Sequence, residues 1–304
     1  MTIKQSLIWA TKILKKSKNF SPALDAEILL SFTIKRPKEF LYAHSEKKLT
    51  AGQLTKFKKQ ITRRRRHEPI AYITDQRYFY GLDFFVNKDV LIPRPETETL
   101  VETAIDKNPT AVVDVGTGSG AIAITLAHHL PNAKIFATEI SPGAIKVARK
   151  NARRHKVAVT LLRGNLLTPF LNLKFKTPNP PAGEAGLKSL MIVANLPYGW
   201  KAWKNKSSVE TRGLKFEPSI ALFAGKNGLE LYEKLLKQIK LLVTRYSLPV
   251  TSIFEIDPRQ TKPITKLIYQ HFGKSPPSRL RGLLRFCDIK KDLAGRDRLV
   301  IFDI

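Results

Sequence analysis

The sequence has little cysteine, no long hydrophobic run and a shortage of acidic residues. Cys287 is the single cysteine among 304 residues, so the chain can form no internal disulfide and has no second thiol for a cysteine-based metal site. We expect a buried thiol in a cytoplasmic protein, where conditions are reducing. No stretch approaches the roughly 18 uninterrupted apolar residues of a membrane helix, so we predict no membrane association.

Acidic residues are scarce relative to basic ones, because 25 Asp and Glu stand against 53 Lys and Arg, which gives a formal charge of +28. Such a charge attracts polyanions over a long range, so contact with RNA or with the ribosome has to be considered. The densest basic run, Arg63 to Arg66, falls in a helical stretch, where a solvated face is the simpler interpretation. The histidines lack neighbouring carboxylates or cysteines in a ligand-like spacing, so we predict no metal site.

Residues 1–70 carry apolar side chains three and four positions apart, which predicts a small bundle of helices. Thr50 is placed to cap one of them. Lysines interrupt the first apolar residues at helical spacing, unlike the continuous apolar core of a signal peptide, so we do not expect export. Residues 71–92 are rich in aromatic and β-branched side chains around Gly81, which predicts a β-hairpin linker.

Residues 93–304 follow a different pattern, in which short apolar strands alternate with amphipathic helices. Such alternation is typical of a parallel sheet covered by helices, so the predicted fold class is α/β and Rossmann-like. Residues 176–186 are rich in Pro and Gly and predict an exposed loop or insertion. The predicted strands cover residues 111–116, 133–140, 159–165, 190–194, 251–256 and 298–303, with further helices near 229–244 and 260–271.

The most specific local pattern is the string DVGTGSG, directly after an apolar strand and directly before a helix. Its glycines permit a tight turn and a close approach of a ligand to the main chain, while the N-terminus of the helix offers unpaired amides. This geometry suits a nucleotide-like ligand, and because no Walker lysine follows, phosphoryl transfer is disfavoured. The residues of this segment that we predict to bind the ligand are Asp114, Gly116, Thr117, Gly118 and Gly120.

Two polar residues at the ends of the next strands extend the predicted ligand site. Glu139 ends the second strand roughly twenty residues after the glycines, where a carboxylate can accept both hydroxyls of a ribose. The alternative for Glu139 is a solvated acid at a strand end. Asn165 ends the third strand, where a polar side chain can read an adenine edge.

The string Asn195-Leu196-Pro197-Tyr198 follows the fourth strand and resembles the (Asn/Asp)-Pro-Pro-Tyr motif of methyltransferases that modify planar nitrogens. The nitrogen of an amide or exocyclic amine has a delocalised lone pair, so it attacks a methyl sulfonium poorly until acceptors hold its hydrogens. The Asn195 side-chain oxygen and the main-chain carbonyl of Leu196 or Pro197 can supply these acceptors, and both bonds strengthen as positive charge develops on the nitrogen. We therefore predict Asn195, Pro197 and Tyr198 as catalytic residues. We predict S-adenosylmethionine as the cofactor, with Asn195 also among the residues that bind it.

The chain as a whole resembles the protein-(glutamine-N5) methyltransferase family of the PrmC/HemK type. The resemblance implies an N-terminal helical substrate-binding domain over residues 1–70, a β-hairpin linker over 71–92 and a seven-stranded class I methyltransferase domain over 93–304. The motifs that carry it, in chain order, are SP with LDAEILL at 21–30, VLIPRPETE at 90–98, NLPY at 195–198, FEP at 216–218, Glu255 with Gln260, and DLAGRDR at 292–298.

The resemblance also implies a substrate, the glutamine in the Gly-Gly-Gln loop of peptide-chain release factors, whose methylation supports translation termination. This glutamine would enter a narrow channel beside Asn195, shaped by Pro93, Arg94 and Glu98, although these three residues could instead fix the hairpin to the sheet. The sequence departs from the pattern at Leu196, in place of the first proline, and at Asn165, where aspartate is common. The substrate-binding residues implied are Pro93, Arg94, Glu98, Asn195, Leu196, Pro197 and Tyr198.

Two other functions stay open at this point. An adenine-N6 methyltransferase acting on RNA or DNA can share the Asn-Leu-Pro-Tyr string, and Tyr198, Trp200 and Trp203 could stack a base. The arginine-proline linker together with the C-terminal DLAGRDR string argues against this function. A catalytically silent RNA-binding or assembly protein would have no need of Asp114, Glu139 and Asn195, and all three are intact. The resemblance further implies a monomer.

Overall fold

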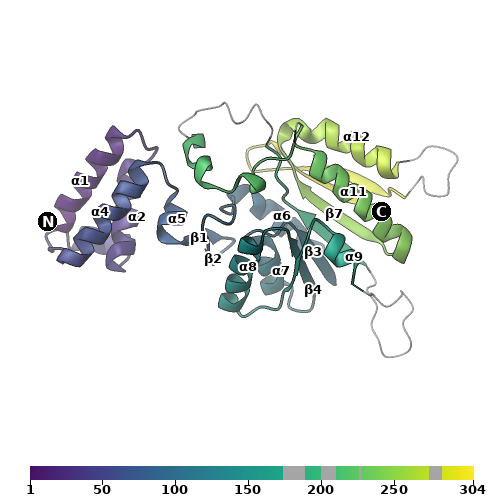
Figure 1. Cartoon of the computed structure of the whole chain (residues 1–304), viewed down its shortest axis with the longest axis horizontal. Helices are drawn as coiled ribbons and strands as arrows, with labels where there is room; N and C mark the ends of the chain where they lie inside the picture. The colour runs from purple at the N-terminus through teal and green to yellow at the C-terminus, as the bar shows by residue number, and fades with distance from the viewer. Residues whose placement is uncertain (174–188, 200–209, 226, 274–282) are drawn as a thin grey trace. The chain divides into compact units, whose positions relative to one another are not determined.

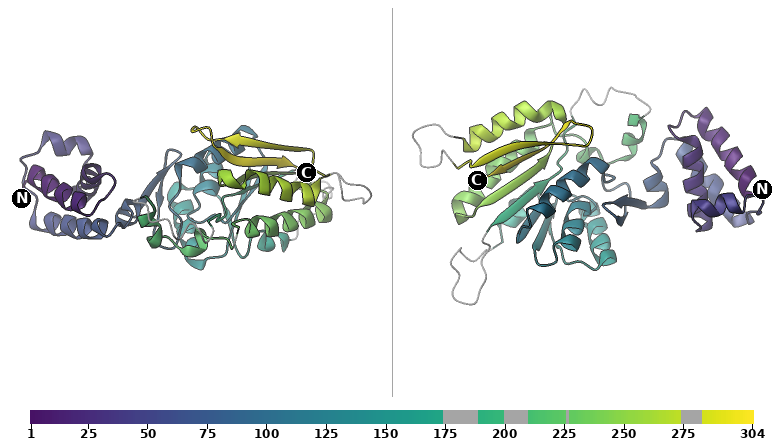
Figure 2. Two further views of the ribbon diagram at one scale, coloured as in Figure 1. Left: turned by 90° about the horizontal axis from the view of Figure 1, so that it is seen from above. Right: turned by 180° about the vertical axis from the view of Figure 1, so that it is seen from behind.

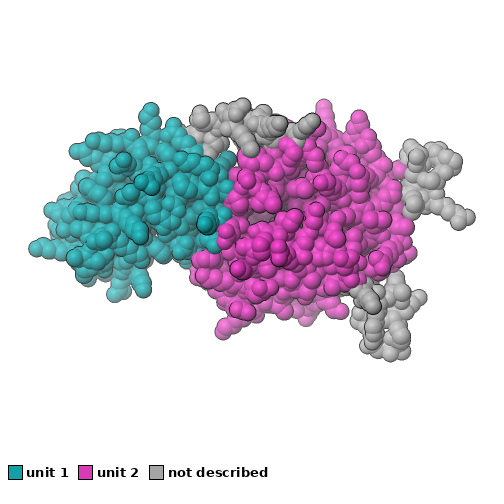
Figure 3. Space-filling view, in the orientation of Figure 1, with its two compact units in different colours: residues 1–76, 86–88, 204–217 teal, residues 77–85, 89–203, 218–304 magenta. Residues whose placement is uncertain are grey.

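The computed structural model describes residues 1–173, 189–199, 210–225, 227–273 and 283–304 (Figure 1). The loop predicted at 176–186 and the side chains of Trp200 and Trp203 lie outside the described residues. The division into domains at 1–70, 71–92 and 93–304 stays a prediction. By compactness the chain separates into a first unit of residues 1–76, 86–88 and 204–217 and a second unit of residues 77–85, 89–203 and 218–304 (Figure 3).

The first unit is helical, as its apolar spacing predicts. The Thr50 hydroxyl accepts a hydrogen bond from the Gln53 N–H, and the Gln53 side chain accepts one from the Thr50 N–H. This capping box fixes the start of a helix, and Thr2 with Gln5 forms another. The elements of this unit are α1 (Ile3–Lys16), α2 (Pro22–Ile34), α3 (Lys38–Ala43), α4 (Ala51–Arg65), α5 (Ile70–Thr74) and η2 (Glu210–Phe216). Its core is Ile3, Ala10, Leu14, Ala26, Leu29, Leu30, Leu41, Phe57, Ile61 and Ile73.

The arginine run at the end of α4 is partly structural. The Arg63 guanidinium donates to both carboxylate oxygens of Glu68, and Arg64 Nε donates to Asp25 Oδ2 at 2.7 Å. Burial raises the pKa of Asp25, although Arg64 acts in the opposite direction. Arg65 and Arg66 are exposed. The solvated face predicted for this run therefore holds for its last two residues, while the first two hold helices together.

The second unit contains a small two-stranded sheet and a seven-stranded sheet, described over the ranges given above. The seven strands run in the order β5-β4-β3-β6-β7-β9-β8. The first five in this order pair in parallel with their neighbours, and β9 pairs antiparallel with both β7 and β8. The strands are β1 (Gln76–Phe79), β2 (Leu82–Phe85), β3 (Ala111–Val115), β4 (Lys134–Glu139), β5 (Thr160–Arg163), β6 (Leu190–Ala194), β7 (Val250–Glu255), β8 (Phe286–Lys291) and β9 (Asp297–Asp303).

Helices cover both faces of the large sheet, and the predicted α/β fold class is confirmed. In Figure 1 α11 and α12 lie in front of the sheet, and the view from behind in Figure 2 shows α6 on the opposite face. None of the helices in the described ranges is both long enough and apolar enough to cross a lipid bilayer. The helices of this unit are η1 (Pro95–Thr97), α6 (Glu98–Asp106), α7 (Ala121–His129), α8 (Pro142–His155), α9 (Thr168–Leu171), η3 (Ser219–Ala221), α11 (Glu230–Tyr246), η4 (Pro258–Gln260) and α12 (Thr261–Phe272).

One strand escapes the sequence pattern, and it changes the expectation for the cysteine. β8 lies at the edge of the sheet, and each of its residues is exposed or half-buried, with Asp288, Lys290 and Lys291 among them. Edge strands lack the apolar run of a central strand. Cys287 lies on this strand and is half-buried, so the expectation of a buried thiol was wrong.

A buried asparagine on α8 ties the small hairpin to the glycine-rich loop. Asn151 is fully buried; its Oδ1 accepts from the Phe85 N–H at 2.8 Å, and its Nδ2 donates to the Phe85 carbonyl at 2.9 Å and to the Ser119 carbonyl at 2.8 Å. Three main-chain groups from two distant segments are thus satisfied by one side chain.

The Asn151→Ala substitution should lower the free energy of unfolding by about 2–4 kcal/mol, because it leaves these main-chain groups without partners. Urea denaturation followed by circular dichroism measures the loss. Asn172→Ala, at an exposed position after α9, is the matched control and should stay within about 0.5 kcal/mol of the parent. Equal losses in the two variants would contradict the role of Asn151.

Candidate active site

A cavity of about 230 Å³ opens at the carboxyl ends of the parallel strands of the second unit. Strands that pair in parallel end at the same edge of a sheet, so the segments that follow β3, β4, β5 and β6 meet there. The lining residues are Asp89, Val90, Leu91, Gly116, Gly118, Thr138, Glu139, Ile140, Ser141, Ala144, Gly164, Asn165, Leu166, Asn195, Leu196, Pro197, Ile220, Ala221 and Leu231.

The glycine-rich loop is held by Asp114 of β3, which is fully buried and does not line the cavity. Its Oδ2 accepts hydrogen bonds from the Thr117 hydroxyl at 2.5 Å and from the Ala123 N–H at 3.2 Å. Burial raises the pKa of Asp114 to about 7, although these two hydrogen bonds act in the opposite direction. Asp114 and Thr117 therefore shape the loop, and Gly116 and Gly118 are the loop residues that line the cavity.

Glu139, at the end of β4, faces both the loop and the start of the next helix. Its Oε2 accepts from the Gly118 N–H at 3.0 Å and its Oε1 from the Ser141 N–H at 2.8 Å. Each carboxylate oxygen has a second lone pair, so the side chain can still accept hydrogen bonds from a ligand. Of the two roles considered for Glu139, this placement favours the ligand-binding one over a solvated strand end.

The far wall of the cavity combines an amide with apolar side chains. Asn165 is exposed and lines the cavity beside Leu166. Ile140 is 47% exposed although it is a large aliphatic residue, and it also lines the cavity. Sequence reasoning missed Ile140, and its only signal is its place directly after Glu139. An apolar wall next to an amide suits a flat, partly polar ring such as adenine.

Asn195 projects from the end of β6 into the same cavity. Its Nδ2 donates to the Thr97 hydroxyl at 2.9 Å, so Oδ1 is the acceptor left for a ligand. Thr97 is buried at the end of η1, within the linker motif, and no role was predicted for it. The signal was available, because Thr97 lies in the VLIPRPETE string that the family resemblance singles out.

Leu196 packs closely on the glycine-rich loop and is 3% exposed. An added Cβ on Gly116, whose φ is +77°, would lie 3.0 Å from the Leu196 Cδ2 atom. The Leu196 N–H donates to the hydroxyl of Tyr232 on α11 at 3.2 Å, and that hydroxyl in turn donates to the Glu255 carbonyl. Tyr232 was not predicted as part of the site.

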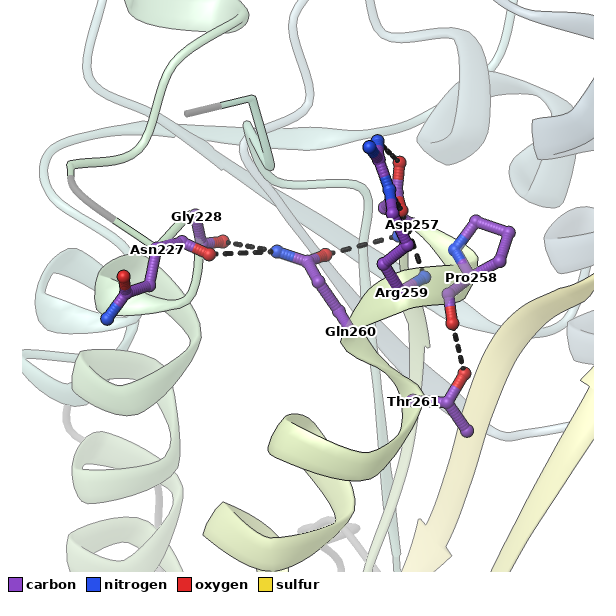
Figure 4. A network of polar contacts seen from close by, with 7 residues as sticks. All are labelled: Asn227, Gly228, Asp257, Pro258, Arg259, Gln260 and Thr261. Atoms are coloured by element: carbon purple, nitrogen blue, oxygen red, sulfur yellow. Dashed lines mark hydrogen bonds and ion pairs between the residues drawn. The ribbon is translucent and has the colours of Figure 1, made fainter. Parts of the chain in front are cut away.

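Tyr198 is half-buried and does not line the cavity. Burial, with the nearby Glu255 carboxyl group, raises the pKa of the Tyr198 phenol, so the phenol stays protonated. Gly228, whose φ is +72°, approaches the Tyr198 carbonyl so closely that no Cβ would fit. The Gln260 side chain donates to the Gly228 carbonyl at 3.0 Å and accepts from the Asp257 N–H at 3.1 Å, as Figure 4 shows.

The three linker residues predicted to shape a substrate channel do not line the cavity. The Pro93 carbonyl accepts from Arg77 Nε at 3.1 Å, and Glu98 Oε1 accepts from the Tyr80 N–H at 2.9 Å. These bonds tie the β1–β2 hairpin to the segment before α6 and to the first residue of α6, which is the structural alternative for Pro93 and Glu98. Arg94 is half-buried and close enough to lower the pKa of the Tyr198 phenol in part.

Glu255, the last residue of β7, is a buried acid. Its exposed fraction is 0%, and among the described residues neither carboxyl oxygen has a hydrogen-bond partner of ordinary geometry. Burial raises the pKa of Glu255 to about 7, while the nearby Thr97 hydroxyl and the Arg298 guanidinium act in the opposite direction. In the described part of the chain, no group of three or more His, Cys, Asp or Glu side chains is placed to hold a metal ion.

Comparison with known proteins identifies the family. A family model described as the PrmC N-terminal domain matches residues 5–74, and one described as the methyltransferase small domain matches residues 95–197. A release factor glutamine methyltransferase from Moorella thermoacetica is 34% identical over 98% of this chain and 97% of its own length. The chain belongs to the release factor glutamine methyltransferase family. Another member, from Koribacter versatilis, is 38% identical over 79% of this chain and 81% of its own length.

This member of the release factor glutamine methyltransferase family is also similar to other methyltransferases. A bifunctional methyltransferase from Rickettsia conorii is 33% identical over 99% of this chain, which spans 57% of that longer protein. The solved catalytic domain of human Mettl16, in complex with a 3′UTR hairpin, has a TM-score of 0.51 and 14% identity over 83% of this chain and 80% of that one. At this identity the likeness shows the methyltransferase fold alone.

The structure brings together part of the predicted site of this family member. The cavity is lined by Gly116, Gly118, Glu139, Asn165, Asn195, Leu196 and Pro197. It is not lined by Asp114, Thr117, Gly120, Tyr198, Pro93, Arg94 and Glu98. The assignment of individual binding and catalytic roles to these residues stays a prediction.

The buried Glu255 should make stability fall as the pH rises. Its pKa in the unfolded chain is near 4.5 and in the folded chain about 7, so between these values unfolding releases a proton, and the folded state loses its advantage as the pH increases. Glu255→Gln has no such titration. The unfolding free energy of Glu255→Gln minus that of the parent should therefore grow by roughly 3 kcal/mol from pH 4 to pH 7 and stay level above pH 8.

Urea denaturation of both proteins at steps of one pH unit tests this. Asp114 has a similarly raised pKa but is present in both proteins, so its effect cancels in the difference. Stability curves that run parallel across this range would mean that Glu255 does not hold its proton in the folded state.

Proposed function

We propose that this protein transfers a methyl group from S-adenosylmethionine to the side-chain amide nitrogen of the glutamine in the Gly-Gly-Gln loop of peptide-chain release factors, and so supports translation termination. The observation that carries the proposal is the placement of Asn195. It lines the same cavity as the glycine-rich loop and Glu139, and its Nδ2 is committed to Thr97, which leaves Oδ1 as an acceptor for an amide N–H. The membership of the chain in the release factor glutamine methyltransferase family supports the choice of substrate.

The residues present fit S-adenosylmethionine. Glu139 offers a carboxylate for ribose hydroxyls, Asn165 and Ile140 offer an amide and an apolar surface for adenine, and Gly116 and Gly118 let the ligand approach the main chain. An added Cβ on Gly118 would meet nothing within 4 Å, so the loop leaves space on the cavity side. When bound, S-adenosylmethionine supplies an electrophilic methyl group on a positively charged sulfur.

The catalytic role of the protein is to hold the nitrogen of the substrate amide. Asn195 Oδ1 and the main-chain carbonyl of Leu196 or Pro197 accept hydrogen bonds from the two amide hydrogens. Because positive charge develops on that nitrogen as the N–C bond forms, both hydrogen bonds are stronger in the transition state than in the ground state. Tyr198 keeps its proton and is no base, so the methylated nitrogen loses its extra proton to water.

Several properties of the complete system belong to the same proposal. We infer that the release factor is the protein partner, that the enzyme works as a monomer in the cytoplasm, and that it needs no metal. Contact of the basic surface with RNA or the ribosome stays a prediction. The adenine-N6 reaction is not favoured, because the full-length relatives named above are release factor glutamine methyltransferases and the Mettl16 likeness concerns the fold alone.

Asn195→Ala should lower kcat/KM for methylation of a release factor by about 100- to 1,000-fold, because it removes one of two acceptors that stabilise the transition state. Binding of S-adenosylhomocysteine should change by less than about threefold. Transfer of labelled methyl from S-adenosylmethionine to purified release factor measures the loss. Asn172→Ala, at an exposed position, is the control enzyme.

Two substrates complete this experiment. A release factor whose Gly-Gly-Gln glutamine is changed to alanine should take up no label from the parent enzyme. If the release factor stays unlabelled while ribosomal RNA in a parallel reaction takes up label, the glutamine assignment fails and the adenine-N6 function replaces it.

Glu139→Gln should weaken binding of S-adenosylhomocysteine by about 10- to 100-fold, because a carboxylate is a stronger acceptor than an amide and the new NH₂ group has to face a main-chain N–H. Isothermal titration calorimetry measures the affinity. The exposed Glu102 on α6 provides the matched Glu102→Gln control, which should bind as the parent does. Unchanged affinity in Glu139→Gln would remove Glu139 from the cofactor site.

A further inference from the structure

One hydrogen bond to the main chain of residues 195–198 has no role in the function as proposed so far. We call these residues, which follow β6, the substrate segment. Tyr232 lies on α11 with 0% of its surface exposed, and it is not among the residues that line the cavity. Its hydroxyl accepts from the Leu196 N–H at 3.2 Å and donates to the carbonyl of Glu255. One phenol thus connects the segment after β6 to the last residue of β7.

The position of this bond coincides with the departure of the sequence from its motif. The related motif has proline at the position of Leu196, and a proline there would carry no N–H and would have a fixed φ. Leucine restores a free φ and brings an N–H into a site where the residue is 3% exposed. A buried N–H needs a partner, and Tyr232 supplies it.

Holding this N–H restrains the main chain from which both acceptors of the site depart. The peptide unit between Asn195 and Leu196 is planar and includes the Asn195 Cα atom, so holding its N–H restrains the atom from which the Asn195 side chain departs. On the other side, Pro197 restricts Leu196 to an extended conformation, which sets the direction of the Leu196 carbonyl.

The far end of the segment has its own contacts. The Gln260 side chain connects the Gly228 carbonyl to the Asp257 N–H at the start of η4 (Figure 4). Gly228 in turn packs on the Tyr198 carbonyl.

At the near end, the Asn195 side chain is held by Thr97, and the Tyr232 bond holds the main chain at Leu196. Among the described residues, the hydrogen bond that holds the Leu196 main chain is the one to Tyr232.

We propose that Tyr232 is a positioning residue of the active site, and that its hydroxyl replaces the rigidity that the missing proline at position 196 would give. The inference rests on the proposed function, since it concerns the acceptors that hold the substrate amide. Tyr232 touches neither substrate nor cofactor and acts through the main chain of Leu196.

A double-mutant cycle in the full-length enzyme tests this, with the parent, Tyr232→Phe, Leu196→Pro and the double variant. Phenylalanine keeps the ring, which packs on Phe254 with centroids 5.1 Å apart, and removes only the hydroxyl. We expect kcat for release factor methylation to fall about 10- to 100-fold in Tyr232→Phe, with KM and S-adenosylhomocysteine affinity within about threefold. In the Leu196→Pro background the same change should lower kcat by less than about threefold, because no N–H is left to hold.

A loss of the same factor in both backgrounds, or a kcat of Tyr232→Phe within about twofold of the parent, would overturn the proposal. The control for general destabilisation is Ile239→Val, which trims a fully buried residue of the same helix and should lower the melting temperature without lowering kcat. If Tyr232→Phe alone does not fold, the double variant decides: a folded enzyme with a kcat near that of Leu196→Pro supports the proposal, and a failure to fold counts against it.

Amide hydrogen exchange separates this inference from the proposed function. If the parent binds S-adenosylhomocysteine but methylates no release factor, the proposed function fails, and exchange at the Leu196 amide then judges the Tyr232 bond alone. Exchange at Leu196 at least about tenfold faster in Tyr232→Phe than in the parent, with the amides of β6 unchanged, supports the bond. Equal exchange at Leu196 in the two proteins overturns it.

Discussion

The parallel pairing of β3, β4, β5 and β6 is the constraint on which the candidate site depends. Parallel register places the last residues of these strands at one edge, so Val115 pairs with Thr138 and with Ala194, although the three are far apart in the sequence. Each strand is followed by irregular backbone whose polar groups need partners. The sheet brings together the glycine-rich loop, Glu139 and Asn195. Side chains from η1 and α11 supply hydrogen bonds to the segment that follows β6.

The fold was largely predictable because its signals are local. Six strands of the large sheet were placed from short apolar runs bounded by turn residues, with ends that differ by a few residues from those observed. β8 was missed because an edge strand has one solvated side and reads as an irregular, charged segment. The Thr50 cap was predictable for the same reason as the central strands, since a capping box is complete within a few residues.

The site was predictable only where a residue contributes through its own motif. Gly116, Glu139 and Asn195 lie in strings whose chemistry can be read from the sequence, and all three line the cavity. Tyr232 was missed because it acts through Leu196, which is distant in the sequence. Thr97 lies in a motif, but its contact with the distant Asn195 could not be read from that motif. Net charge was similarly uninformative about function, since Arg63 and Arg64 are used to hold helices together.

The contact between Leu196 and Tyr232 also imposes an order on how such a site can change over generations. A chain with proline at position 196 can gain or lose the phenol hydroxyl without leaving an N–H unpaired at this position, because proline has none. Once leucine stands there, the hydroxyl can no longer be lost without stranding a buried donor. Tyrosine at position 232 is therefore expected to arise before leucine at position 196. Once leucine is present, the loss of the tyrosine hydroxyl is hard to tolerate.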